Sequence, residues 1–191
     1  MNTPGIAKLR RELFSLIKKE AYCEGDFLLS SGKRSDYYID CRKVTLTSKG
    51  AYLAALLILD AIKGKKIDAV GGPTIGADPI VGAVSVLSLV KYNKPIKAFL
   101  VRRSAKSHGL QRQIEGPKIK KGSCVVVVDD VATTGGSLIE TVSCLKKKGL
   151  RVDKVIVLVD RNQGAREGLK KLKCKLISLF NIEEFRNNPK R

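Results

Sequence analysis

The apolar run from Val125 to Val128 leads directly into two adjacent carboxylates, Asp129 and Asp130, and this junction constrains the fold more than any other feature. Four β-branched residues bounded by polar ones are too few to span a membrane and favour a buried, parallel strand. In open α/β sheets, ligands bind outside the carboxyl ends of the strands. The sequence therefore predicts that the acid pair stands at the rim of a ligand site.

The residues that follow the acid pair are typical of a phosphate-binding turn that opens a helix. Ser137 and Glu140 have the spacing of a capping box, and an amphipathic helix follows as far as about Gly149. Backbone N–H groups and the positive end of a helix dipole bind phosphate at such a turn. The hydroxyl and glycine residues available for this are Thr133, Thr134, Gly135, Gly136 and Ser137.

An acid pair beside an anion-binding turn indicates which ligand the site holds. Carboxylates accept hydrogen bonds from sugar hydroxyls and favour hydrated magnesium, whereas the turn needs a phosphate. A phosphorylated ribose meets both requirements and is the predicted ligand. Taken singly, the glycines indicate only a tight loop, and Asp130 only a turn cap. The ordered set of strand, acids, hydroxyls, glycines and helix is much more specific.

Length and cysteine usage bound the class of protein. A chain of 191 residues suits one α/β domain with a small attachment. No apolar run approaches the roughly 20 residues of a membrane span and no signal-peptide pattern is present, so we expect a cytoplasmic protein with no membrane partner. The five cysteines are odd in number and include no C-x-x-C pair, which argues against a disulfide framework and a zinc site.

The charge of the chain is unusual, because 37 Lys and Arg residues against 18 Asp and Glu residues leave a net charge of +19. The lysines are spread along the chain rather than grouped, which is typical of solvated surfaces, so we expect no nucleic-acid partner. A positive field of this size would still raise the encounter rate with polyanionic small substrates.

Hydrophobic periodicity predicts a doubly wound, mostly parallel α/β sheet with a small N-terminal cap, or hood. We expect the hood over residues 1–45, with an amphipathic helix at 4–21 and then short strands and loops, and the core over 46–191. Thr47 or Ser48 begins a helix that runs to about Lys63. Strands are expected near 67–70, 96–101, 123–129, 152–159 and 175–180, and helices near 77–92, 137–148 and 164–171. No G-x-G-x-x-G or G-x-x-x-x-G-K-[ST] pattern indicates a dinucleotide or nucleoside-triphosphate fold.

Two more segments have the character of binding loops. The stretch 71–78 follows a predicted strand and opens a helix, so its backbone could hold a second anion such as pyrophosphate. The segment 102–116 is long and basic, which is typical of a lid. It carries His108, the single histidine of the chain. A lone histidine is usually an ordinary surface or core residue, but on a basic loop next to Gly109 it could donate to a leaving phosphate. Lys106 and Arg102 would supply positive charge there.

With these segments the chain resembles the orotate phosphoribosyltransferases, a branch of the type I phosphoribosyltransferase family, over nearly its whole length. The acid-pair segment is similar to the signature of the whole family, and the cap and lid segments narrow the resemblance to the orotate branch. The residues that carry it are 29–38 in the cap, Gly72–Thr74, 102–109 in the lid, 125–137, and Asp160–Ala165.

The resemblance implies an enzyme of UMP biosynthesis, a pentosyltransferase that moves the 5-phosphoribosyl group of phosphoribosyl pyrophosphate to orotate with Mg²⁺. It implies a homodimer with shared active sites, and magnesium held mainly by the substrate and water rather than by protein ligands. The residues implied for phosphoribosyl pyrophosphate are Arg102, Arg103, Lys106, His108, Asp129, Asp130, Val131, Ala132, Thr133, Thr134, Gly135, Gly136 and Ser137. Orotate is assigned to Thr133 and Arg161, and the catalytic residues are Lys106, His108, Asp129 and Asp130.

The chain departs from some family members in the cap and in the loop after the first core strand. Those members have lysine at the position of Ser30, lysine in place of Arg103, and a Tyr-Lys pair where Ile75 and Gly76 stand. Arg103 keeps the charge, whereas Ser30 and Gly76 do not. The contacts that these two positions make with substrate are therefore left open.

Two rival functions share part of the pattern. A purine, xanthine or uracil phosphoribosyltransferase would keep the acid pair, but a neutral base needs no guanidinium, whereas Arg161 can hold the carboxylate of orotate with a two-pronged contact. A non-catalytic regulator that senses phosphoribosyl pyrophosphate would need a DNA-reading module, and the single helix before Glu24 leaves no room for one.

Overall fold

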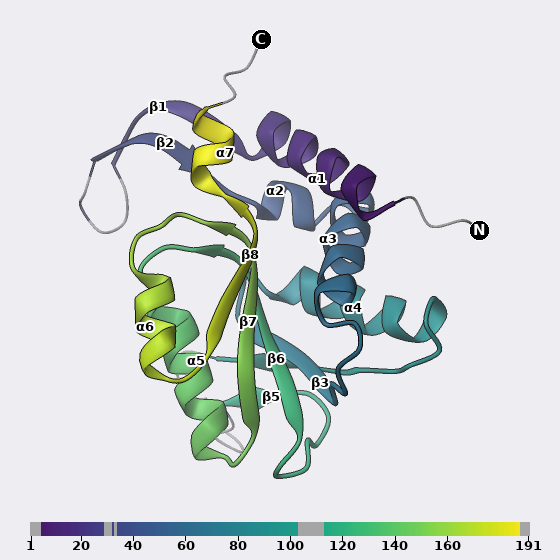
Figure 1. Ribbon diagram of the computed structural model, residues 1–191. Helices are drawn as coiled ribbons and strands as arrows, with labels where there is room; N and C mark the ends of the chain where they lie inside the picture. Colours follow the sequence, from purple (N-terminus) through teal and green to yellow (C-terminus); the bar gives the residue numbers. More distant parts are fainter. Residues whose placement is uncertain (1–4, 29–31, 33, 103–112, 188–191) are drawn as a thin grey trace.

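The computed structural model of the protein describes residues 5–28, 32, 34–102 and 113–187 (Figure 1). Ser30, Arg103, Lys106 and His108, for which the sequence raised specific expectations, lie outside the described residues. Within the described ranges, no helix is long and apolar enough to cross a membrane.

A six-stranded sheet forms the centre of the molecule, in the order β5-β4-β3-β6-β7-β8. The neighbouring strands pair in parallel, except that β5 runs antiparallel to β4 at one edge. This confirms the expected α/β fold with a doubly wound, mostly parallel sheet. The bounds are β3 Ala69–Pro73, β4 Lys97–Val101, β5 Ile114–Glu115, β6 Cys124–Ala132, β7 Arg151–Asp160 and β8 Lys175–Asn181.

The valine run of β6 is buried on both faces of the sheet, as expected for a parallel strand with helices on either side. Val126 and Val128 belong to the cluster that contains α3 (Ser48–Ala61) and α4 (Asp78–Val90). Val125 and Val127 belong to the cluster that contains α5 (Gly136–Lys147) and α6 (Ala165–Lys171). Each of these valines contributes roughly 1.5–3 kcal/mol by its burial. Figure 1 shows α5 and α6 together on one side of the sheet and α3 and α4 on the other.

The hood stands at the end of the sheet toward which the parallel strands run (Figure 1). It consists of an amphipathic helix, a two-stranded antiparallel sheet and a short helix, and the C-terminal helix packs on it. The bounds are α1 Ile6–Glu20, β1 Tyr22–Leu28, β2 Arg34–Ile39, α2 Arg42–Thr45 and α7 Ile182–Arg186.

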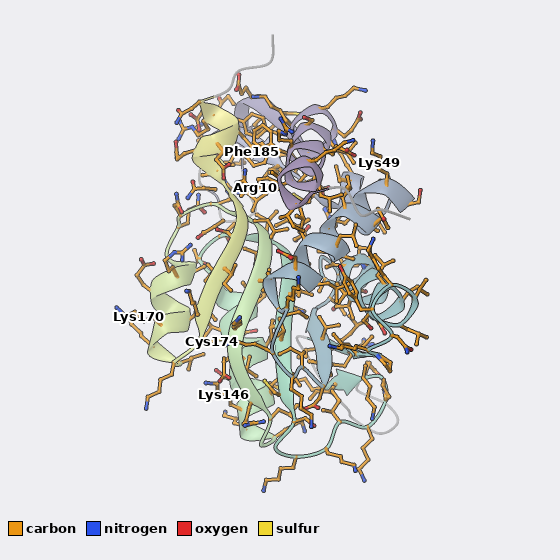
Figure 2. The ribbon with its side chains drawn as sticks, turned by 45° about the vertical axis from the view of Figure 1, so that its right-hand side comes forward. Arg10, Lys49, Lys146, Lys170, Cys174 and Phe185 are labelled. Carbon is orange, nitrogen blue, oxygen red and sulfur yellow. The ribbon has the colours of Figure 1, made fainter. Side chains whose placement is uncertain are left out.

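Contacts between α1 and the C-terminal elements fasten the hood to the core. The ring of Phe14 stacks on that of Phe185, with centroids 4.6 Å apart. Arg10 donates a hydrogen bond to Glu184 Oε2 at 2.6 Å, and its guanidinium lies 4.6 Å from the centroid of the Phe180 ring. Figure 2 shows Arg10 and Phe185 at this junction of α1 and α7. The hood therefore depends on residues from both ends of the chain.

The positive charge is spread over the surface, as the sequence indicated. Figure 2 shows the labelled lysines on three different elements, with Lys49 on α3, Lys146 on α5 and Lys170 on α6. Lys146 donates a hydrogen bond to the carbonyl oxygen of Leu172 at 2.6 Å. This lysine therefore satisfies the carbonyl of the residue that follows α6.

Several element boundaries differ from the sequence expectations. The helix α3 starts as expected, because Thr47 is its N-cap and accepts a hydrogen bond from Gly50 N. The expected capping box at Ser137 is wrong, since α5 begins at Gly136 after an N-cap at Gly135 without a side-chain cap. A capping box is present instead at α7, between Asn181 and Glu184.

The strands at the carboxyl edge of the sheet are longer than expected. β3 pairs with β4 as far as Pro73, and β6 pairs with β7 as far as Ala132. Both strands therefore continue to these residues. The acid pair therefore lies within β6 rather than after it. The expected anion-binding loop at 71–78 is correspondingly reduced to residues 74–77.

Candidate active site

The candidate site lies where the order of strands in the sheet changes direction. After β3 the chain moves through α4 to β4 on one side, and it later returns to form β6 on the other side of β3. Open α/β sheets bind ligands at such a switch point, outside the carboxyl ends of the strands. The loop 74–77 after β3 and the turn 133–135 after β6 border this crevice.

The acid pair is held by hydrogen bonds from its own backbone. The N–H of Asp130 donates to Asp129 Oδ1 at 3.0 Å, and the N–H of Val131 donates to Asp130 Oδ1 at 2.7 Å. Burial raises the pKa of Asp130 above its ordinary value, although the bond from Val131 and the charge of Arg42 act in the opposite direction. An ionised carboxylate offers about four acceptor positions, so ligand hydroxyls beside Asp130 would offset part of the cost of its burial.

The loop after β3 packs directly against these carboxylates. A Cβ atom at Gly76 would lie 2.4 Å from Asp130 Oδ1 and 2.6 Å from Asp129 Oδ1. Only a residue without a side chain leaves both carboxylate oxygens where they are. This gives a physical reason for glycine at a position where some family members have lysine.

The turn after β6 forms a cleft of about 340 Å³. Thr134 and Gly136 are exposed in it, and Thr133 and Ser137 are half-buried. Backbone N–H groups at the start of α5 are available to an anion, as at other helix N-termini. The residues that line the cleft are Asp129, Val131, Ala132, Thr133, Thr134, Gly135, Gly136, Ser137, Leu138 and Glu140.

Gly135 has a packing role as well as a place in the turn. Its φ of +81° lies in the left-handed region, and a Cβ atom there would lie 2.8 Å from the Cα atom of Ala165 at the start of α6. A residue with a side chain is therefore excluded by its neighbour and is strained by its backbone conformation. Close contact of the turn with α6 explains why the helix begins here and not at Ser137.

Arg161 follows β7 and lies beside the turn that carries Thr133. Its backbone N–H donates to the carbonyl oxygen of Ala132 at 2.9 Å. The preceding Asp160 is 1% exposed and shapes this corner, because it accepts hydrogen bonds from Asn162 N at 2.9 Å and from Arg166 Nη2 at 3.1 Å. The fold thus brings Thr133 and Arg161, which the sequence assigned to one ligand, to adjacent strand ends.

The guanidinium of Arg161 is buried and only partly satisfied. Arg161 is 9% exposed, its Nε donates to the hydroxyl of Tyr37 at 2.9 Å, and its Nη2 has no hydrogen-bond partner among the residues that the structure describes. Leaving a buried charged donor unpaired is costly, so this nitrogen is suited to an anionic ligand.

The cavity beside Arg161 has a volume of about 640 Å³ and contains other charged groups that are already paired. Arg186 Nη2 lies 2.7 Å from Asp36 Oδ2, and Arg34 forms an ion pair with Asp26. Arg161 therefore differs from the other two arginines that line this cavity, because within the described residues its guanidinium makes no ion pair with an acid of the hood. Hood and core residues meet here at the carboxyl edge of the sheet.

Of the four residues expected to bind pyrophosphate through the lid, Arg102 is the one within the described residues. Its backbone N–H donates to the carbonyl oxygen of Gln113 at 2.9 Å, and its Nη1 lies 3.8 Å from Glu115 Oε1. Gln113 in turn accepts a hydrogen bond from Cys144 Sγ at 3.1 Å. The two ends of the segment 102–113 are therefore joined at β4 and β5.

Sequence reasoning missed two residues of this site. Tyr37 was noted only as part of the cap, because a tyrosine in a short strand carries no signal of its distant arginine partner. Gly76 was noted as part of the stretch 71–78 and as a departure from other family members, but not as a neighbour of the acid pair. Its closeness to the acid pair joins a loop to a strand about fifty residues further along the chain, and no local sequence pattern indicates a contact over such a separation.

Comparisons with known proteins agree with this geometry. A family model described as the phosphoribosyl transferase domain matches residues 46–187. An orotate phosphoribosyltransferase of Nostoc sp. is 47% identical over 180 residues, which covers 94% of this chain and 86% of that protein. The crystal structure of Mycobacterium tuberculosis orotate phosphoribosyltransferase in complex with Fe(III) dicitrate has a TM-score of 0.80 and 36% identity, covering 93% of this chain and 98% of that one.

A second crystal structure of the Mycobacterium tuberculosis enzyme, in complex with 5-phospho-α-D-ribosyl 1-diphosphate, has a TM-score of 0.77 and 30% identity and covers 93% of this chain and 99% of that one. The fold and the acid-pair turn are thus those of a phosphoribosyl transferase domain. The chain belongs to the phosphoribosyl transferase family and, within it, to the orotate phosphoribosyltransferases. The resemblance noted from the sequence is confirmed.

Proposed function

We infer that the chain is an orotate phosphoribosyltransferase, a pentosyltransferase that moves the 5-phosphoribosyl group of phosphoribosyl pyrophosphate to orotate and releases orotidine 5-phosphate and pyrophosphate. The observation that carries this inference is the buried Nη2 of Arg161, which has no hydrogen-bond partner among the described residues and lies beside the turn that holds Thr133. Orotate carries a carboxylate, and a guanidinium fork is its fitting partner. This reaction belongs to pyrimidine biosynthesis.

Phosphoribosyl pyrophosphate would occupy the crevice at the switch point. Asp129 and Asp130 accept hydrogen bonds from the ribose 2- and 3-hydroxyls. The 5-phosphate lies in the turn, where the hydroxyls of Thr133, Thr134 and Ser137 and the N–H groups at the start of α5 surround it. The solved structure of the Mycobacterium tuberculosis relative in complex with 5-phospho-α-D-ribosyl 1-diphosphate supports this compound as the ligand. Val131, Ala132, Gly135 and Gly136 contribute backbone rather than side chains.

The pyrophosphate is assigned to the basic residues of the lid, which are Arg102, Arg103, Lys106 and His108. Within the described residues, no three His, Cys, Asp or Glu side chains are grouped so that they could hold a metal ion. We propose that Mg²⁺ would be held mainly by substrate oxygens and water, in keeping with its reluctance to dehydrate, and that Asp129 and Asp130 would contact its water shell. When bound, the ion neutralises charge on the departing pyrophosphate.

Catalysis in this proposal comes from positioning and from charge stabilisation. The bond from C1 of the ribose to pyrophosphate breaks through an oxocarbenium-like transition state, and the deprotonated ring nitrogen of orotate forms the new bond on the opposite face. Lys106 and His108 stabilise the charge of the leaving pyrophosphate, and His108 can donate a proton to it. Closure over the site excludes water that would otherwise hydrolyse the sugar.

A homodimer is part of the proposal, because a set of large apolar side chains is exposed. Val86, Leu89 and Val90 recur at helical spacing on one face of α4 and are 60%, 53% and 75% exposed. Ile75, which precedes Gly76 in the loop beside the acid pair, is 63% exposed. Exposed apolar patches mark interaction surfaces. We propose that a second copy covers this face in a C2 dimer, and the family resemblance implies that the two copies share their active sites.

The experiment that tests the function compares orotate with uracil, which is orotate without its carboxylate. The absorbance of orotate should fall when phosphoribosyl pyrophosphate and magnesium are added, and the specificity constant for orotate should exceed that for uracil by at least about a hundredfold. Arg161→Ala should remove most of this preference by impairing orotate alone. Arg161→Lys should recover only part of it, since an ammonium group cannot make the planar contact.

The two outcomes that contradict the proposal are distinct. A parent protein that leaves orotate unchanged in the presence of both substrates and magnesium is not this enzyme. If the parent consumes orotate and Arg161→Ala keeps the same ratio of specificity constants for orotate and uracil, another residue binds the carboxylate.

A further inference from the structure

We propose that Tyr37, in strand β2 of the hood, is a positioning residue that aims the guanidinium of Arg161 at the carboxylate of orotate. This inference rests on the proposed function and adds a residue to its specificity. It also assigns a task to the hood, which otherwise only covers the end of the sheet.

Tyr37 contacts the guanidinium of Arg161 in two ways, with its hydroxyl and with the face of its ring. Its hydroxyl accepts the hydrogen bond from Arg161 Nε at 2.9 Å, and the guanidinium carbon lies 4.7 Å from the centroid of its ring. Tyr37 is 6% exposed and Arg161 is 9% exposed, so water does not compete strongly for either contact. With Nε engaged, the Nη side of the fork is the part left for a ligand, and Nη2 is the nitrogen without a partner in the described part of the chain.

To position the Arg161 guanidinium for an anionic substrate, its partner in the protein has to be neutral. A carboxylate at the same place would neutralise Arg161 and compete with the carboxylate of the substrate. The neighbouring Asp36 does not take this role, because its Oδ2 pairs with Arg186 Nη2 at 2.7 Å. A tyrosine hydroxyl satisfies one donor of the guanidinium and leaves its charge in place, so the attraction for an anion is retained.

Tyr37 is itself held firmly, which a positioning residue must be. Its ring lies 5.9 Å from that of Tyr22, centroid to centroid, with an angle of 27° between the planes. Its carbonyl oxygen accepts a hydrogen bond from Ser35 Oγ at 2.7 Å, and in the β1–β2 ladder it stands opposite Glu24. The tyrosine ring also has only two rotatable side-chain bonds to fix.

The contact links the hood to the core over a long stretch of chain, because 124 residues separate Tyr37 from Arg161. Arg161 is anchored on the core side by its backbone bond to Ala132. Its side chain therefore bridges the two parts of the molecule. The direction of the fork depends on the hood being in place, so the hood contributes to substrate choice through this one hydroxyl and ring.

The test is Tyr37→Phe, which removes the hydroxyl and keeps the ring, with Tyr22→Phe as the matched control. The Tyr22 hydroxyl makes a long hydrogen bond, 3.4 Å to Glu24 Oε1, and its ring stacks on that of Tyr37 in the same aromatic cluster, whereas Arg161 Nε donates its hydrogen bond to Tyr37. For each protein we would measure kcat and KM with orotate and with uracil, and the melting temperature by circular dichroism.

Tyr37→Phe should lower kcat/KM for orotate by about tenfold or more, mostly through a higher KM, because one hydrogen bond to a charged group is lost. Its kcat/KM for uracil should stay within about twofold of the parent, since uracil has no carboxylate for the Arg161 guanidinium to bind. Tyr22→Phe should leave the orotate-to-uracil ratio unchanged. Tyr37→Leu, which removes the ring as well, should lower the ratio further than Tyr37→Phe.

A purely structural role of Tyr37 predicts a different result, namely equal losses with both substrates and a lower melting temperature. That result, or an unchanged ratio in Tyr37→Phe, would overturn the positioning role while the proposed function stands. A parent protein without activity on orotate would overturn both. A selective loss for orotate in Tyr22→Phe of the same size would also overturn the assignment, because it would trace the effect to the aromatic cluster and not to the hydroxyl on Arg161.

Discussion

Replacing Gly76 with alanine should weaken the binding of phosphoribosyl pyrophosphate while leaving the stability of the fold nearly unchanged. The added Cβ atom would meet Asp130 Oδ1 at 2.4 Å and Asp129 Oδ1 at 2.6 Å, below the 3.0 Å that real Cβ contacts respect. The Asp130 oxygen would have to retreat by about 0.6 Å, the difference between 2.4 and 3.0 Å. Carboxylate ends can rotate, so the backbone does not need to move.

The displaced carboxylates would lose much of their hydrogen bonding to the ribose hydroxyls. A hydrogen bond to a charged group is worth about 1.5–3 kcal/mol, and each 1.4 kcal/mol corresponds to about tenfold in affinity. We therefore expect the Kd of phosphoribosyl pyrophosphate to rise by roughly tenfold or more. Calorimetric titration in the presence of magnesium measures this constant, and the melting temperature reports the stability of the fold.

Gly168→Ala is the matched control, because it also adds one methyl group against the end of a flexible side chain. Gly168 lies on α6, and its added Cβ atom would lie 2.5 Å from Cδ1 of Ile139 on α5 rather than against the acid pair. It should leave the Kd unchanged. An unchanged Kd in Gly76→Ala as well would refute the reasoning, since it would show that the position of the carboxylates does not set the affinity. A large fall in the melting temperature of Gly76→Ala would show that the loop, and not the carboxylates, gives way.

Three more predictions concern the acid pair, the lid and the assembly. Burial raises the pKa of Asp130, so the folded state holds its proton more tightly than the unfolded state, and the free energy of unfolding falls as the pH rises through the interval between the two pKa values. Asp130→Asn should therefore melt at the same temperature as the parent at pH 7 or a few degrees higher, with weaker substrate binding; a clearly lower melting temperature would contradict this. Lys106→Ala and His108→Ala should each lower kcat more than they raise KM in steady-state assays, and losses confined to KM would argue against a role in the transition state. Mixing inactive Lys106→Ala protein with inactive Asp129→Asn/Asp130→Asn protein should restore activity when subunits exchange, whereas confirmed mixed dimers that stay inactive would exclude a lid that acts on its neighbour.

The period of the apolar residues was enough to predict the class of fold. In β6, Val125 and Val127 face one helical layer while Val126 and Val128 face the other, and a strand buried on both sides is what a continuous apolar run indicates. The start of α3 at Thr47 could also be predicted, because an N-cap uses the side chain and N–H groups of one turn. Signals of this kind act over a few residues, so the sequence displays them directly.

Local signals were less reliable where tertiary contacts compete with them. Ser137 and Glu140 have the spacing of a capping box, yet α5 starts earlier, because Gly135 adopts a left-handed conformation against Ala165 of α6. β6 runs past the acid pair because β7 offers it partners as far as Ala132. An element ends where its neighbours stop supporting it, and a single segment does not contain that information.

By itself, the sequence determined the doubly wound domain, the acid pair near the carboxyl end of a buried strand, and the hydroxyl and glycine turn that follows it. It also placed Arg161 and Thr133 after two predicted strands. Only the tertiary structure decided that the Tyr37 hydroxyl holds the Arg161 guanidinium and that Gly76 lies against Asp129 and Asp130. These contacts join segments far apart in the chain, and no periodicity or short motif encodes which distant side chain will fill a given position. Strand order and the packing of the hood on the sheet settle that, because they fix the distances between residues that share no local pattern.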